Sequence, residues 1–101
     1  MTPKGRFAKL SEYQKAILLA LGPDYEKADD PENVKWTPQQ KCRPKPMLRQ
    51  ILHESVQRLI QRGLVEKKPK ERIAMLRLTE EGFAAVTWLR LQEQIRQLEE
   101  E

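Results

Sequence analysis

The sequence has little of what a disulfide scaffold, a metal site or a membrane protein needs. Its 101 residues include one cysteine, Cys42, and one histidine, His53. One cysteine cannot form an internal disulfide, and the two residues together do not supply the ligands of a structural zinc site. The longest apolar run, residues 16–21, is far shorter than the ~20 residues that cross a bilayer, and no apolar run follows the basic start as in a signal peptide. We therefore expect a cytoplasmic protein without metal, cofactor or membrane contact.

The chain also lacks a recognisable set of catalytic residues. Nucleophilic catalysis requires a nucleophile beside a base, whereas Cys42 and His53 are eleven residues apart and are expected on different elements. We therefore predict that the protein is not an enzyme. A sensor role for Cys42 remains an alternative, although only Lys41 and Arg43 lie near it in sequence to lower its pKa.

Positive charge is abundant but unevenly distributed. The net charge of +4 divides into +3 over residues 1–15, −4 over 16–34, +8 over 35–72 and −3 over 73–101. A basic middle between acidic segments favours a surface that binds a polyanion, and a merely solvated basic face is the alternative.

The first part of the chain predicts one helix and a long connection. Ser11 is placed to cap a helix over about 11–21, which the pair Gly22-Pro23 should end. Its apolar stripe is Tyr13, Ile17, Leu18 and Leu21. Residues 22–45 lack periodicity and are rich in proline, so they predict a long loop with one short helical turn within Thr37–Cys42. Within this loop, Trp36 is expected to anchor the segment to the body.

The strongest helical pattern covers residues 46–62, from Pro46 to the residue before Gly63. Its apolar positions repeat at helical spacing and share one side: Leu48, Ile51, Leu52, Val56, Leu59 and Ile60. The other side and its margins are polar: Arg49, Gln50, His53, Glu54, Gln57, Arg58 and Gln61.

Two short segments, 64–68 and 73–78, predict a hairpin whose inward residues are Leu64, Leu76 and Leu78. Its tip would carry Lys67, Lys68, Lys70 and Arg72. Thr79 is then placed to cap a C-terminal helix over 79–101. Within that helix Ala84, Trp88, Leu91, Ile95 and Leu98 follow the spacing of a coiled-coil seam. The first half should pack on its own domain, and Trp88, Leu91, Ile95 and Leu98 are candidates for a homodimer interface.

One stretch of the chain resembles a known family. Residues 55–68, which read SVQRLIQRGLVEKK, and residues 76–82, which read LRLTEEG, resemble the recognition helix and wing of winged-helix regulators of the MarR type. The resemblance covers roughly residues 46–90. It implies a winged helix-turn-helix. Together with the patterns above, we expect a mainly α single domain over 1–101 with a small β-hairpin, a basic arm at 1–10 and an extended C-terminal helix.

The resemblance also implies how such a protein binds double-stranded DNA. The polar face of helix 46–62 would lie in the major groove, with Gln50, His53, Glu54, Gln57, Arg58 and Gln61 approaching the bases, while Lys67, Lys68, Lys70 and Arg72 contact phosphates. Lys41, Arg43 and Lys45 would meet a phosphate at the helix start. The helix that normally precedes the recognition helix is missing from the pattern. Either Thr37–Cys42 is a stunted second helix, or the long helix takes over its role.

The sequence thus favours a DNA-binding homodimer that regulates transcription. A winged-helix module that binds proteins without specific DNA binding is the alternative, which the long 22–45 segment favours.

Overall fold

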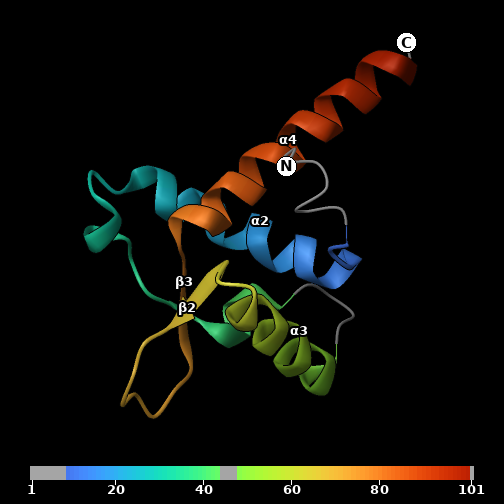
Figure 1. Cartoon of the computed structure of the whole chain (residues 1–101). Helices are drawn as coiled ribbons and strands as arrows, with labels where there is room; N and C mark the ends of the chain where they lie inside the picture. The colour runs from blue at the N-terminus through green and yellow to red at the C-terminus, as the bar shows by residue number, and fades with distance from the viewer. Residues whose placement is uncertain (1–8, 44–47, 101) are drawn as a thin grey trace.

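A computed structural model describes residues 9–43 and 48–100 of the chain. Over these residues the protein is mainly helical, with a small antiparallel sheet (Figure 1). The α-helices are α2 (Glu12–Lys27), α3 (Arg49–Gln61) and α4 (Glu80–Glu100). Two 3-10 helices, η1 (Pro31–Asn33) and η2 (Gln39–Cys42), and three strands, β1 (Thr37–Pro38), β2 (Val65–Lys67) and β3 (Met75–Leu78), complete the described part. The predicted basic arm is described only from Lys9, and the predicted helix start at Pro46 lies outside the described residues.

Helix α2 begins as the sequence predicts but ends later. The Gln14 N–H donates to Ser11 Oγ at 3.1 Å, which caps the helix. The predicted stop at Gly22-Pro23 is wrong, because the helix continues to Lys27 with Pro23 inside it. Contacts with α4 stabilise this extra turn: the Tyr25 ring stacks on Phe83 with centroids 4.6 Å apart, and Glu26 pairs with Arg90.

Gly22 permits this packing by its small size. It is buried against α4, where an added Cβ would lie 3.1 Å from Val86 Cγ1. The residue that the sequence marks as a helix stop is therefore a close-packing position between two helices.

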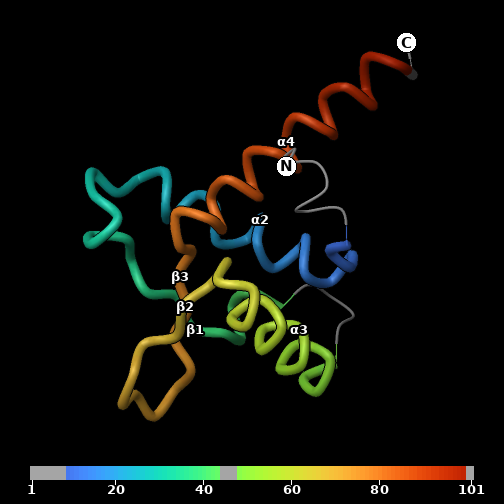
Figure 2. The backbone as a smooth tube through the Cα atoms, viewed as in Figure 1, coloured from blue at the N-terminus to red at the C-terminus, as the bar shows by residue number. Residues whose placement is uncertain are grey.

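The segment between α2 and α3 is more ordered than the predicted long loop. Its described part, drawn as a tube in Figure 2, holds η1, β1 and η2. The Thr37 Oγ1 donates to Asp24 at 2.7 Å. The expected short turn in Thr37–Cys42 is the 3-10 helix η2, and β1 before it was not expected. Trp36 is half-buried under the guanidinium of Arg77, 4.2 Å from the ring centroid, so its predicted anchoring role is confirmed.

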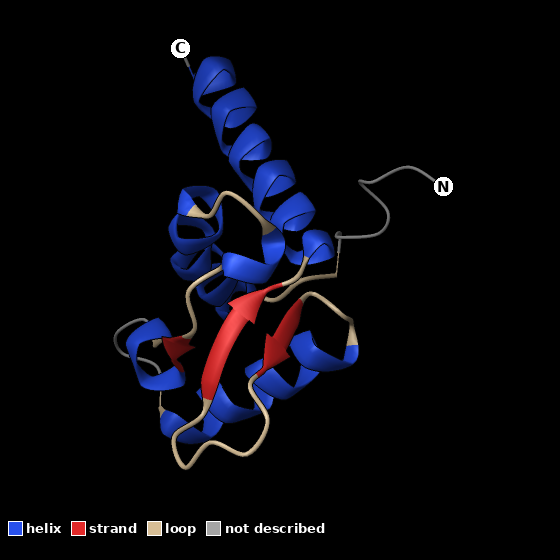
Figure 3. Ribbon diagram, turned by 90° about the vertical axis from the view of Figure 1, so that its left-hand side faces the viewer, coloured by secondary structure: helices blue, strands red, loops and turns tan. Residues whose placement is uncertain are grey.

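The predicted hairpin is confirmed as β2 and β3, and β1 adds a third strand. The strand order is β1-β3-β2, so β3 is central (Figure 3). Val65 faces Leu78, Lys67 faces Leu76, and on the other edge Thr37 faces Leu76. As predicted, Leu64, Leu76 and Leu78 are buried.

One hydrophobic core joins all the main elements. Helix α2 packs on α3, α4 and β3, and it lies between the other two α-helices (Figure 1). The core side chains from these elements include Ile17, Leu18, Leu21, Leu52, Val56, Leu59, Leu76, Leu78, Ala85, Val86 and Leu89. Tyr13 was expected in this core but is 45% exposed, because it lies on the flank of the first turn of α2.

Helix α4 is longer than the body that it packs on. Its N-terminal half contributes to the core, whereas every residue from Leu91 to Glu99 is exposed. The C-terminal half therefore projects from the molecule (Figures 1 and 3). In the described ranges, no helix combines the length and apolar character that a bilayer crossing requires.

Candidate nucleic-acid interface

Helix α3 presents a polar face to solvent. Its residues Leu52, Val56 and Leu59 are buried in the core, at a spacing that turns the opposite side outward. The outward side chains are Arg49, Gln50, His53, Glu54, Arg58 and Gln61, all exposed as predicted. Gln57 is half-buried at the margin of this face. The polar face of α3 can therefore contact a ligand without any rearrangement of the core.

The tip of the hairpin concentrates positive charge. Lys67, Lys70 and Arg72 are exposed, and none of them takes part in an ion pair among the described residues. Lys68 is half-buried and its Nζ lies 3.2 Å from Glu71 Oε1, an exposed pair that neutralises one of the four charges. Lys70 has a positive φ of 64°, so the turn holds its backbone in a conformation that few non-glycine residues adopt.

A second group of cations lies near the hairpin tip, on η2. The Gln39 N–H donates to Ala74 O at 2.8 Å, so η2 starts beside the tip end of β3. Lys41 and Arg43 on and after η2 are exposed, whereas Lys45 lies outside the described residues. Helix α3 begins after Leu48, whose side chain cannot cap it. Among the described residues, no side chain caps the first-turn amides of α3.

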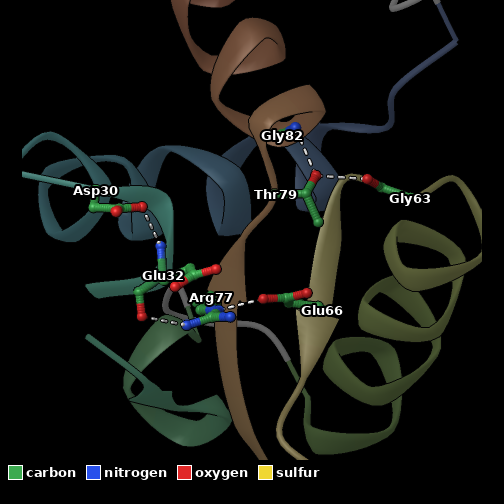
Figure 4. A network of polar contacts seen from close by, with 7 residues as sticks. All are labelled: Asp30, Glu32, Gly63, Glu66, Arg77, Thr79 and Gly82. Atoms are coloured by element: carbon green, nitrogen blue, oxygen red, sulfur yellow. Dashed lines mark hydrogen bonds and ion pairs between the residues drawn. The ribbon is translucent and has the colours of Figure 1, made fainter. Parts of the chain in front are cut away.

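The opposite end of the sheet is acidic. At the base of the hairpin, Arg77 pairs with Glu66 and donates through Nη1 to Glu32 O at 3.3 Å (Figure 4). This network lines a groove of about 380 Å³ whose other charged side chains are Asp30 and Glu80. Sequence reasoning missed the network, although the alternation of β3 places Arg77 opposite the buried Leu76 and Leu78. The hairpin is thus basic at its tip and acidic at its base.

The joint between the hairpin and α4 is built on Thr79. Its N–H donates to Leu64 O at 3.1 Å. Its Oγ1 donates to Gly63 O at 2.6 Å, and the Gly82 N–H donates to that Oγ1 at 3.0 Å (Figure 4). The predicted capping role of Thr79 is confirmed. One residue therefore fixes the start of α4 to the end of α3 and the start of β2.

The predicted dimerisation residues divide into two groups. Trp88 is half-buried and packs against the core, as expected for the first half of α4. Leu91, Ile95 and Leu98 are 51%, 48% and 72% exposed. Among the described residues, these three side chains form an exposed apolar stripe on α4.

Cys42 lies in η2 and His53 in α3, so the prediction that they belong to different elements is confirmed. His53 is exposed on α3, whereas Cys42 is 3% exposed and its thiol donates to Pro38 O at 3.7 Å. Burial, with the nearby carboxylate of Asp24, raises the pKa of the Cys42 thiol from 9.0 to about 11. Reactive cysteines have depressed pKa values, so Cys42 has the character of a structural core residue. Over the same described ranges, no cluster of three or more His, Cys, Asp or Glu side chains is positioned to hold a metal ion.

No family model, curated protein or solved structure matches this chain. The resemblance to winged-helix regulators therefore rests on the quoted residues of the recognition helix and wing.

Proposed function

We propose that the protein is a winged-helix domain that binds double-stranded DNA through the polar face of α3 and the basic tip of the hairpin. The observation that carries the proposal is the combination of three exposed cations at the hairpin tip, without ion pairs among the described residues, with an exposed polar helix that ends where the hairpin begins. Phosphate oxygens are the ligands that exposed Lys and Arg side chains favour on DNA. A role in transcription regulation follows from the same proposal.

The two surfaces would contribute differently. Lys67, Lys70 and Arg72 suit phosphates, which supply affinity and carry no base sequence. Arg58 and the exposed glutamines of α3 have the donors and acceptors that read base edges, Arg at guanine and Gln at adenine. Lys41 and Arg43, together with the first-turn amides of α3, would hold a phosphate beside the groove. The η2 turn would then stand where the second helix of a helix-turn-helix normally lies.

The separation of charge between the two ends of the hairpin indicates which end would face DNA. Its acidic base, with Glu66, Glu32 and Asp30, would be repelled by a polyanion, whereas its tip would be attracted. The tip and not the base of the sheet is therefore the end that faces DNA.

The test is a fluorescence anisotropy titration of a labelled duplex of about 20 bp, two helical turns. We expect binding that weakens between about 50 and 200 mM salt, as counterion release requires. The variant Lys67→Ala/Lys70→Ala/Arg72→Ala should bind more weakly, and its log–log salt slope should be shallower by about 3, since each phosphate contact contributes ~0.9.

A matched control removes the same charge elsewhere. Lys9, Lys15 and Lys27 lie on or beside α2, outside the hairpin and α3, and their triple alanine variant should keep most of the affinity and the full salt slope. Absence of duplex binding by the wild-type chain at low salt would overturn the proposal. An equal loss in both triple variants would also overturn it, because binding would then depend on net charge alone.

A further inference from the structure

The tip of the hairpin carries an exposed apolar side chain among its cations. Ile73 is 64% exposed, and within residues 64–78, all of which the structure describes, it is the one large apolar side chain left exposed. Leu76 and Leu78, further along the same arm, are buried in the core. Exposure of apolar surface to water is unfavourable, so a partner that covers Ile73 would gain affinity from its burial.

Two backbone hydrogen bonds hold the chain on the C-terminal side of Ile73. The Ala74 carbonyl accepts from the Gln39 N–H at 2.8 Å. The Met75 carbonyl accepts from the Lys68 N–H at 3.0 Å. Isoleucine is branched at Cβ, which leaves few rotamers open to its side chain. Ile73 is therefore a stiff side chain beside an anchored part of the hairpin, and little conformational entropy is lost when a ligand covers it.

The charges around Ile73 indicate an anionic partner. The hollow that Ile73 lines, of about 300 Å³, is also lined by the exposed cations Lys70 and Arg72. Neither cation takes part in an ion pair among the described residues. The other two charged side chains of the hollow, Lys68 and Glu71, pair with each other at 3.2 Å, so the hollow keeps a net positive charge. A partner that satisfies this surface has anionic groups beside an apolar surface.

Double-stranded DNA offers this combination at its minor groove. Phosphates border the groove, and the apolar faces of two stacked base pairs become accessible when the step between them opens. Apolar side chains, isoleucine among them, can be inserted at such a step from the minor groove, and the duplex is kinked there. Helix α3 would fill the major groove, and the hairpin follows α3 directly in the chain, so the tip would reach the groove alongside (Figure 1).

We propose that Ile73 is a wedge that opens one base step from the minor groove, while Lys70 and Arg72 contact the adjoining phosphates. The inference rests on the proposed DNA binding and adds to it a preferred class of ligand, a duplex with a step that opens easily. Opening a step costs stacking free energy, and this cost is lowest where a flexible step or a mismatch has already weakened the stacking. The protein would thus select deformable DNA through a side chain that reads no base.

Fluorescence anisotropy with two labelled duplexes of about 20 bp tests the wedge. The duplexes differ only in adjacent mismatched pairs at the centre of one of them, so their length and phosphate charge are equal. We expect the wild-type chain to bind the mismatched duplex roughly tenfold more tightly, because part of its stacking is already lost. Ile73→Ser should bind both duplexes with equal affinity. Ile73 lies outside the core, so this variant should keep the wild-type fold.

A matched control removes another exposed apolar side chain. Leu19 lies on α2 and is 40% exposed, and Leu19→Ser should keep the preference for the mismatched duplex. Equal affinity of the wild-type chain for the two duplexes, or a preference that survives in Ile73→Ser, would overturn the wedge and leave the proposed DNA binding intact. Absence of binding to both duplexes at low salt would overturn the proposed function and the wedge together.

Energy transfer between dyes at the two ends of the mismatched duplex measures the kink directly. The mismatch fixes the position of the wedge, and a kink of about 20–90° brings the two ends closer together. The transfer efficiency should therefore rise when the wild-type chain saturates the duplex, and saturation with Ile73→Ser should leave it unchanged. A transfer efficiency that stays constant with the wild-type chain, or that rises equally with Ile73→Ser, would contradict the assignment of the wedge to Ile73.

Discussion

Position 82 has no room for a side chain and therefore requires glycine. It is buried in the first turn of α4, and a Cβ added there would overlap the carbonyl oxygen of Leu64. That oxygen also accepts from the Thr79 N–H, so neither the backbone of Leu64 nor the start of α4 can move without breaking the joint between them.

Gly82→Ala should therefore destabilise the protein by about 2–3 kcal/mol through overpacking against backbone. Urea unfolding followed by circular dichroism measures this loss. Gly63→Ala is the matched comparison, since its Cβ would meet nothing within 4 Å and its cost, about 1 kcal/mol, comes from the positive φ of 77°. A Gly82→Ala variant as stable as the wild type would show that α4 does not approach Leu64 so closely.

Cys42 gives the stability a pH dependence in the alkaline range. Because its pKa is about 11 in the folded state and 9.0 ordinarily, the unfolded chain releases the thiol proton first as the pH rises. The thiol therefore contributes stability below pH 9 that is lost progressively toward pH 11. The free energy of unfolding should decline more steeply between these values for the wild type than for Cys42→Ala. Parallel pH profiles for the two proteins would contradict the assigned burial.

At the scale of elements, Arg77 joins the segment before β1 to the sheet. Its guanidinium covers Trp36, pairs with Glu66 and donates to Glu32 O, so one side chain of β3 contacts both the segment before β1 and strand β2. The order of the segment between α2 and β1 therefore depends on a residue of β3.

Arg77→Met should cost about 1–2 kcal/mol, because it removes the cation from the Trp36 ring and leaves Glu66 without its partner. We also expect faster amide hydrogen exchange over residues 31–36. Arg90→Met is the control: it removes the ion pair with Glu26, in which both side chains are about 40% exposed, and such a pair contributes under ~1 kcal/mol. Unchanged exchange over 31–36 in Arg77→Met would be evidence against the anchoring role.

The elements that the sequence predicted are those whose pattern is local. Helix α3, the hairpin and α4 repeat their apolar residues at spacings that define one structure, and their caps at Thr79 and Gly63 are marked by residue type. Strand β1 has two residues and is defined by a partner far along the chain, so no local pattern could predict it. The last turn of α2 was missed for a similar reason. Contacts with α4, such as Tyr25 on Phe83, outweigh the local tendency of Gly22-Pro23 to end a helix.

The sequence predicted the exposed residues of the candidate site but not the ion pairs that depend on the fold. Exposure of the α3 face and the hairpin cations follows from periodicity and turn position, and the structure agrees except at the half-buried Gln57 and Lys68. The acidic network at the hairpin base was not predicted, because its members come from separate segments and only the fold brings Glu32 beside Arg77.

At the scale of the whole molecule, the basic surface and the exposed apolar surface lie at different ends. The basic tip and α3 lie at one end, and the apolar stripe of α4 extends from the other (Figure 1). Substitutions at the proposed DNA-binding surface therefore leave the stripe unchanged, and substitutions in the stripe leave that surface unchanged.

The hydrogen bonds at Thr79 have a consequence for how the protein opens. Because Thr79 bonds to Gly63, Leu64 and Gly82, the first turn of α4 cannot fray without releasing the base of the hairpin. The hairpin and the start of α4 thus form one cooperative unfolding unit. Any ligand that holds the hairpin tip in its native form stabilises this whole unit by mass action. Binding of a ligand at the hairpin tip should therefore slow amide hydrogen exchange at the base of the hairpin, where the ligand makes no contact.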